Sequence, residues 1–146
     1  MINKKSFTNC ILKPMTTTLH DIESEADIAY FLDRFYDRVR NDAELGYIFD
    51  EVAKVDWLAH LPRVAAFWSG ILLGSGTYQG NPMRPHFELA QKTPISADHF
   101  DQWLALFTQT LNECFAGERT REALLRAQSI AAVMQSRMYT AGLLAQ

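Results

Sequence analysis

Residues 72–86, with the sequence LLGSGTYQGNPMRPH, decide how this 146-residue chain is interpreted. Two leucines end a helical pattern, and a stretch rich in glycine and proline then runs to His86. A structureless loop of about a dozen residues is uncommon in a compact domain unless it serves a function. Glycine and proline fix the backbone of this loop, which delivers the imidazole at its end. Because neutral imidazole is the commonest protein ligand for a metal, His86 is a candidate metal ligand.

Apolar residues recur at helical spacing in four segments, and none alternates convincingly as a strand does. The first helix is predicted over about 18 residues, with an apolar stripe of Ile28, Phe31, Leu32, Phe35, Tyr36 and Val39. A break at Asn41, Asp42 and Gly46 precedes a short turn that presents Leu45, Ile48 and Phe49. This first segment therefore predicts a helix with one buried face.

The second helix is expected from about residue 56 to residue 73, with Asp56 as its N-cap. Pro62 is awkward there because it removes an interior hydrogen bond, so we expect a kink or a later start. The residues that face inward are Leu61, Val64, Ala65, Trp68, Ile71 and Leu72. After the loop, residues 86–91 have room for only a turn or two before Pro94.

A third helix is expected to begin after an N-cap at Ser96 and to end at Gly117. Its stripe is Phe100, Trp103, Leu104, Phe107, Leu111 and Cys114. Thr120 is placed to cap a fourth helix, whose buried residues are Ala123, Ala127, Ile130, Ala131, Met134 and Met138. Together the segments predict an all-α single domain over residues 20–146, preceded by a poorly ordered tail over residues 1–19.

Composition excludes several classes of protein. The net charge is −3 and acids and bases are interspersed, which argues against nucleic acid as the main partner. No stretch approaches the apolar length of a membrane span, so we expect no membrane partner. Cys10 and Cys114 cannot build a disulfide framework, which favours a reducing cytoplasm. Met15 is a second candidate start, because the periodic pattern begins only after it.

The polar groups expected on buried faces suggest a pocket. His60 projects towards the apolar face of the second helix, where a core histidine with one hydrogen bond is the simpler interpretation. Tyr36 and Trp103 lie on buried stripes of two other helices, and each has a polar group that needs a partner. With His86 added, the set favours a pocket that holds a ligand, although a helical bundle with merely buried histidines stays an alternative. We assign no ligand role to His20, and we expect a surface role for His99.

The ordered motifs resemble one family. FYDRVR at residues 35–40, IF at 48–49, His60 with FW at 67–68, and WLALF at 103–107 are similar to truncated haemoglobins. The block at residues 72–86 is similar to the third group of that family, and the resemblance extends over residues 21–142. It implies a two-over-two helical sandwich around haem b.

The resemblance also implies roles for individual residues. His86 corresponds to the proximal iron ligand, Tyr36 and Trp103 to distal polar residues, His60 to a distal gate, and Phe49 to the ring that packs on the haem. Pro62, two residues after His60, departs from this pattern and is expected to alter how the His60 side chain moves to admit a ligand. The other residues assigned to the cofactor pocket are Val64, Phe67, Trp68, Met83 and Arg84. Arg84 is placed to pair with a haem propionate or, equally, to face solvent.

The implied function is the binding of O₂, NO or another diatomic ligand at ferrous iron. Tyr36, Trp103 and His60 can donate hydrogen bonds to charge that develops on bound oxygen, which slows its release. This favours NO dioxygenation or peroxide reduction over oxygen transport. Because the chain has no flavin or nicotinamide module, a separate reductase would supply electrons. A non-enzymatic gas sensor or gas store is the competing interpretation.

Overall fold

The computed structural model describes residues 18–76, 78 and 80–146. Nearly all of the tail predicted over residues 1–19, including Cys10 and Met15, lies outside the described residues. So do Thr77 and Gln79 of the loop. No helix in the described part of the chain is long and apolar enough to span a membrane.

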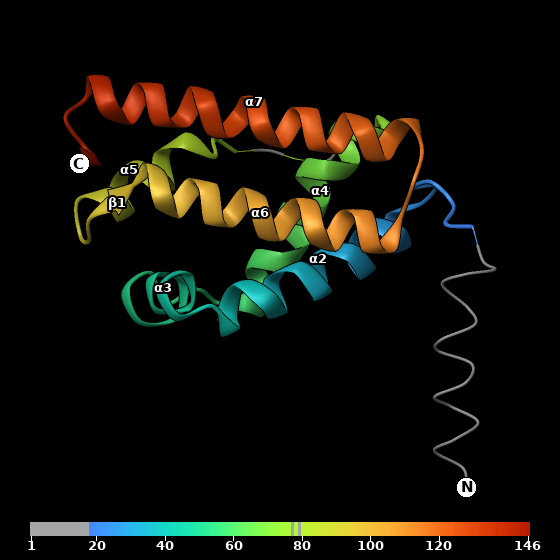
Figure 1. Ribbon diagram of the computed structural model, residues 1–146, viewed down its shortest axis with the longest axis horizontal. Helices are drawn as coiled ribbons and strands as arrows, with labels where there is room; N and C mark the ends of the chain where they lie inside the picture. The colour runs from blue at the N-terminus through green and yellow to red at the C-terminus, as the bar shows by residue number, and fades with distance from the viewer. Residues whose placement is uncertain (1–17, 77, 79) are drawn as a thin grey trace, which may run out of the picture.

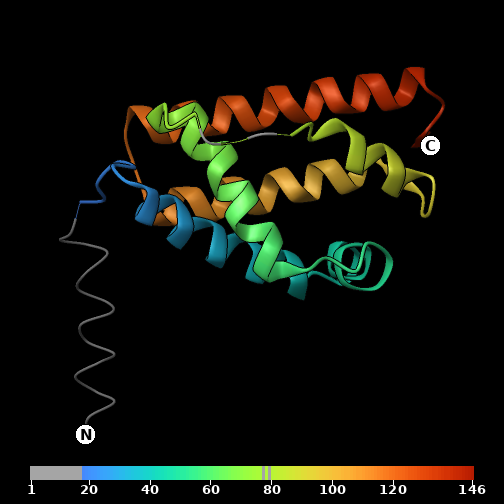
Figure 2. The ribbon, with the colours of Figure 1, turned by 180° about the vertical axis from the view of Figure 1, so that it is seen from behind.

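Four long helices form the body of the protein. They are α2 (Glu25–Asn41), α4 (Trp57–Leu73), α6 (Ala97–Cys114) and α7 (Glu118–Thr140). Helix α2 contacts α4 and α6, and α7 contacts both α6 and α4. Helices α6 and α7 run side by side in Figure 1, and the reverse view in Figure 2 shows α4 crossing them. The arrangement confirms the prediction of an all-α sandwich of two helix pairs.

Aromatic side chains join the helices in the core. All the residues predicted for the stripe of α2 are buried. The rings of Phe31 and Phe35 on α2 lie 5.0 and 5.3 Å from Phe107 on α6, and Trp68 on α4 lies 5.3 Å from the same ring. Burying one such side chain stabilises a fold by roughly 1.5–3 kcal/mol. Phe107 is therefore the point at which the helices carrying the candidate site are held together.

The break after α2 is helical rather than a simple turn. The Asp42 carboxylate caps a short helix, α3 (Ala43–Gly46), by accepting hydrogen bonds from Glu44 N and Leu45 N. A π-helix, η1 (Tyr47–Val52), follows. Gly46 is required here, because a Cβ atom at this position would lie 2.3 Å from the carbonyl oxygen of Arg40. The close approach turns the chain back towards α2.

Helix α4 begins at Trp57, with Asp56 as its N-cap residue. Pro62 was expected to kink this helix or to delay its start; the start is not delayed, because Pro62 lies within the helix. Without its N–H, Pro62 leaves the carbonyl of Leu58 without its usual helical donor. Leu58 is 91% exposed, so water can satisfy that carbonyl. The helix therefore tolerates the proline near its solvent-facing start.

The segment after the loop also differs from the prediction. Helix α5 (Met83–Ala90) starts three residues before His86 rather than at it. Two short strands, β1 (Ile95–Ser96) and β2 (Leu144–Ala145), pair in parallel, although no strand was expected. Ser96 caps α6 as predicted. His99 completes that capping box, because its Nδ1 accepts a hydrogen bond from Ser96 N at 3.0 Å.

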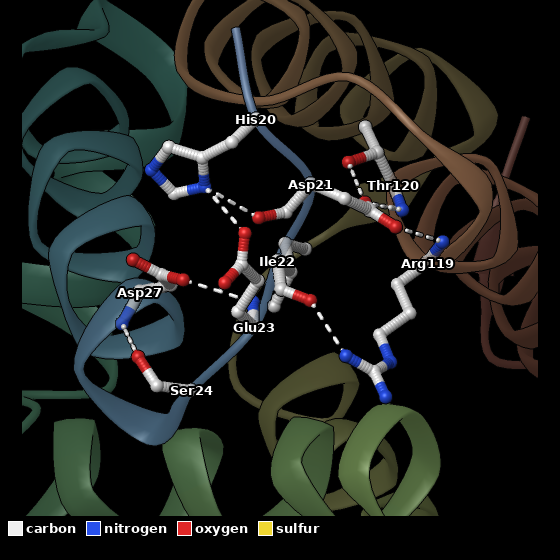
Figure 3. A network of polar contacts seen from close by, with 8 residues as sticks. All are labelled: His20, Asp21, Ile22, Glu23, Ser24, Asp27, Arg119 and Thr120. Carbon is white, nitrogen blue, oxygen red and sulfur yellow. Dashed lines mark hydrogen bonds and ion pairs between the residues drawn. The ribbon is translucent and has the colours of Figure 1, made fainter.

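The start of α7 is capped by a residue from the far end of the chain. Thr120 was predicted as the N-cap but lies inside the helix and is buried. Asp21 takes the capping role: its carboxylate accepts hydrogen bonds from Arg119 N and Thr120 N, both at 2.9 Å (Figure 3). Gly117, the N-cap position, must be glycine, since a Cβ atom would lie 2.4 Å from Asp21 Cγ. Asp21 thus ties the start of the described chain to α7.

Candidate functional site

Three helical elements bring a group of rings together at one end of α2. Tyr36 on α2 lies 5.7 Å from the ring of His60 on α4 and 6.1 Å from Phe49 on η1. Trp57, at the start of α4, lies 5.3 Å from Tyr36 and 5.5 Å from His60. Three residues predicted for the site, Tyr36, Phe49 and His60, are therefore neighbours in space.

Trp103 on α6 is a further polar residue predicted for the site, and its ring packs against Phe35, as does the ring of Tyr36. The Trp103 side chain lowers the pKa of Tyr36 in the way that a hydrogen-bond donor to the phenolic oxygen does. Because an indole N–H can only donate, the phenolic oxygen of Tyr36 is the acceptor. Burial raises the pKa of Tyr36 far above its usual value of 10.0, and the bond from Trp103 opposes that rise only in part. The Tyr36 hydroxyl therefore keeps its proton and has it available to donate.

His60 carries a buried atom that the surrounding protein leaves unsatisfied. Its Nε2 is buried and has no hydrogen-bond partner among the described residues. A buried polar atom without a partner costs about 1–3 kcal/mol. Burial, followed by the nearby charges of Arg63 and His86, lowers the pKa of His60 below 6.5, so its ring is neutral at pH 7. The simpler interpretation, a core histidine satisfied by the protein itself, does not fit this nitrogen.

His86 on α5 is held in a different way. Its Nδ1 lies 2.6 Å from the carbonyl oxygen of Pro82. A carbonyl can only accept, so Nδ1 carries the proton and Nε2 has a free lone pair. Burial lowers the pKa of His86 below 6.5, although the bond to Pro82 opposes this shift. The ring is therefore a neutral imidazole with a fixed tautomer and a free lone pair on Nε2, which is the form that binds a metal.

The remaining predicted pocket residues lie in different surroundings. Val64 and Phe67 on α4 are half-buried and pack against the main core. Trp68 is buried within that core, next to Phe107. Met83 instead packs against a second apolar cluster that includes Met134.

Arg84 lies on the surface of α5. It is exposed and forms an ion pair with Glu88, with 3.4 Å between Nε and Oε1. Cys114, predicted for the apolar stripe of the third helix, is a half-buried free thiol whose pKa is raised by burial. Neither residue joins the ring group around Tyr36.

Sequence reasoning missed Trp57 and its two polar partners. Trp57 Nε1 donates to Asp50 Oδ1 at 2.8 Å, and the guanidinium of Arg40 lies 4.9 Å from the centre of the indole ring. The available signal was the position of Trp57 three residues before His60, which places both on one face of a helix. The loss of helical pattern after Gly46 hid Asp50, the η1 residue that accepts the hydrogen bond of Trp57.

Comparisons with known proteins point to one family. The model of the family described as bacterial-like globin matches residues 17–137. A group 3 truncated haemoglobin from Campylobacter jejuni is 35% identical over 122 residues, which cover 82% of this chain and 94% of that protein. The crystal structure of a group III truncated haemoglobin from Campylobacter jejuni superposes with a TM-score of 0.73 at 34% identity. That match covers 84% of this chain and 96% of the other.

Proposed function

The chain belongs to the group III truncated haemoglobins, within the bacterial-like globin family, and from this premise we propose that it is a haem b protein for oxygen or nitric oxide chemistry. Haem-based binding of a diatomic gas follows from the family. The choice of haem b, the preference for chemistry over oxygen transport, and the role of each residue are parts of the proposal. We also place the protein in the cytoplasm, because its few cysteines suit a reducing compartment.

The two histidines support a haem between α4 and α5. His86 has a fixed tautomer and a free Nε2 lone pair, as a proximal ligand requires. His60 has a buried Nε2 that the described residues leave without a partner, as expected beside a pocket whose ligand is a separate molecule. The half-buried Phe49, Val64 and Phe67 would supply apolar contacts.

Haem bound here would supply a ferrous iron centre with one coordination position open to O₂ or NO. The protein's own contribution on that side is the proton of Tyr36. Since Trp103 donates to the Tyr36 oxygen, the Tyr36 hydroxyl is oriented and free to donate to a small polar ligand. The role proposed for Trp103 therefore becomes one of orienting Tyr36. His60 is close enough to Tyr36 to act on the same ligand.

The strength of these donors argues against oxygen transport. A hydrogen bond to a charged partner contributes about 1.5–3 kcal/mol, and each 1.4 kcal/mol changes an equilibrium tenfold. One donor therefore slows the release of a charged ligand about 10- to 100-fold. The observation that carries the proposal is the buried, unpartnered Nε2 of His60 beside the buried side chain of Tyr36. Repeated turnover needs electrons, which we assign to a separate reductase.

The test is repeated consumption of nitric oxide. Purified protein loaded with haem is reduced, equilibrated with O₂, and given successive additions of NO with a flavin reductase and NADH. We expect catalytic loss of NO over many additions and formation of nitrate. A single stoichiometric loss that is not renewed would contradict the proposal and would identify a gas-binding or gas-sensing module. Tyr30→Phe is a suitable control, because Tyr30 lies on α2 with its side chain exposed.

A further inference from the structure

Three residues outside the ring group form a second, connected set. Asp50 accepts a hydrogen bond from Trp57 Nε1 at 2.8 Å. It also forms an ion pair with Arg40, with 3.3 Å between Arg40 Nε and Asp50 Oδ2. Arg40 also lies over the indole ring of Trp57, at 4.9 Å from its centre. Each of the three therefore contacts the other two. We call Arg40, Asp50 and Trp57 the latch.

The latch draws its residues from the same three elements as the rings of Tyr36, Phe49 and His60. Arg40 lies one turn after Tyr36 on α2, and Asp50 directly follows Phe49 on η1. Trp57 lies one turn before His60 on α4. Each ring of the pocket thus has a latch residue beside it in the chain. A movement of one element away from the others must break a contact of the latch.

Trp57 connects the two sets. Its polar neighbours are the Asp50 carboxylate and the half-exposed Arg40 side chain. Its ring is edge-on to His60, with an interplanar angle of 88°, and stacks on Phe49 at 26°. Because the His60 nitrogen has no hydrogen-bond partner among the described residues, packing against rings such as that of Trp57 must confine the imidazole.

We propose that Trp57 is a positioning residue that confines His60, and that the latch thereby sets how fast a small ligand enters and leaves the pocket. The inference rests on the proposed function, since it concerns access to the same site. A closed latch holds the Trp57 ring against His60 and raises the barrier to passage in both directions. Opening the latch changes both rates by the same factor and leaves the affinity unchanged, because Trp57 itself makes no contact with the ligand.

Three substitutions test the latch in haem-loaded, reduced protein. Trp57→Phe keeps a ring and removes the N–H, and Asp50→Leu removes both contacts of the carboxylate. Asp50→Asn keeps an acceptor for Trp57 and removes the ion pair with Arg40. Tyr30→Leu is the matched control, because it removes the other cation–π pair of α2, with Arg34, on an exposed surface. Carbon monoxide is the probe, and its association and dissociation rates are measured by flash photolysis and ligand replacement.

We expect Trp57→Phe and Asp50→Leu to raise both rates about tenfold with an unchanged dissociation constant, the effect of losing one charge-assisted hydrogen bond. Asp50→Asn should fall between these variants and the wild type, and Tyr30→Leu should match the wild type. Rates within twofold of the wild type in Asp50→Leu would overturn the proposal. A change in dissociation alone would also overturn it, because Trp57 would then be a ligand contact.

A second readout does not depend on gas binding. Hydrogen exchange of the indole N–H of Trp57, followed by NMR, reports whether the latch is closed. We expect exchange to accelerate in the order wild type, Asp50→Asn, Asp50→Leu, in step with the carbon monoxide rates. If exchange accelerates while those rates stay fixed, the latch is only structural and the proposal is wrong. Failure of the wild type to take up haem would instead refute the proposed function. If Trp57→Phe does not fold, the Asp50 variants carry the test.

Discussion

Of the two histidines at the candidate site, His86 is anchored through its ring and His60 is not. His86 donates from Nδ1 to the Pro82 carbonyl at 2.6 Å, on a short helix whose side chains are half-buried or exposed. His60 lies on a long helix, yet its buried Nε2 has no hydrogen-bond partner in the described part of the chain. One ring is therefore oriented by a hydrogen bond on a lightly packed segment, and the other is confined by packing on a well-packed helix.

The difference matches two different tasks. A residue that binds a metal throughout needs a fixed tautomer, and a backbone carbonyl provides it without any other side chain. A residue that contacts only a transient ligand must keep a polar atom without a partner in the protein. Burying that unpaired atom lowers the stability of the fold. The variants below weaken or sharpen this contrast between an anchored and a free histidine.

The largest effect is expected for Tyr36→Phe, which removes the donor next to the free histidine. We expect the rate of O₂ dissociation to rise about 10- to 100-fold, because one hydrogen bond to a charged ligand is lost. Stopped-flow replacement of O₂ by carbon monoxide measures this rate. Trp103→Phe should give a smaller rise, since we propose that Trp103 orients the Tyr36 hydroxyl rather than donating to the ligand.

The control for Tyr36→Phe is Tyr30→Phe on the same helix. Tyr30 is 54% exposed, so loss of its hydroxyl should leave the O₂ dissociation rate unchanged. If Tyr36→Phe also left this rate unchanged, Tyr36 would not be the donor, and His60 would be the remaining candidate on that side.

An intermediate effect is expected for His60→Leu in the haem-free protein. Replacing the unpartnered imidazole by an apolar side chain of similar size should raise the free energy of unfolding by about 1–3 kcal/mol. Because burial lowers the pKa of His60, protonation disfavours the folded state, and the wild type loses stability as the pH falls through 6.5. The gain from His60→Leu should therefore grow below pH 6.5. Urea unfolding of the wild type and His60→Leu at pH 7.5 and 5.5 measures the gain at each pH. A loss of stability in His60→Leu at either pH would contradict an unpartnered His60 Nε2.

The smallest effect is expected far from both histidines, at Asp21. Although its own burial raises the pKa, hydrogen bonds from Arg119 and Thr120 lower the pKa of Asp21 to about 2. The carboxylate therefore stabilises the fold above pH 3.8, and this contribution is lost as the pH falls from 3.8 through 2. Asp21→Ala should lower the free energy of unfolding by about 1 kcal/mol at pH 7, the value of a helix cap. Its haem affinity at pH 7 should equal that of the wild type.

Patterns within one helix were readable from the sequence. The stripe of α2 and the cap at Ser96 follow from local spacing and were predicted correctly. The cap of α7 was not, because Asp21 is 98 residues away from Arg119 and no local signal connects them. Thr120 was the best local candidate, but it lies buried inside the helix instead.

At the candidate site too, some features were predictable from the sequence and others were not. The convergence of Tyr36, His60 and Phe49 was anticipated from buried faces and family motifs, and the structure brings them together. Trp57 was missed because its partners lie on α2 and in the π-helix, which has no recognisable sequence period. The tautomer of His86 depends on a backbone carbonyl, and such a group leaves no mark in a sequence.

The contrast between the histidines is tested most directly by titrating purified protein with haemin and recording absorption spectra before and after reduction. The wild type, His86→Ala and His60→Leu are compared under the same conditions. We predict a saturable one-to-one Soret band for the wild type and for His60→Leu, with a histidine-ligated spectrum that His86→Ala loses. Identical titrations for the wild type and His86→Ala, or loss of the spectrum in His60→Leu instead, would contradict the assignment of His86 as the anchored metal ligand.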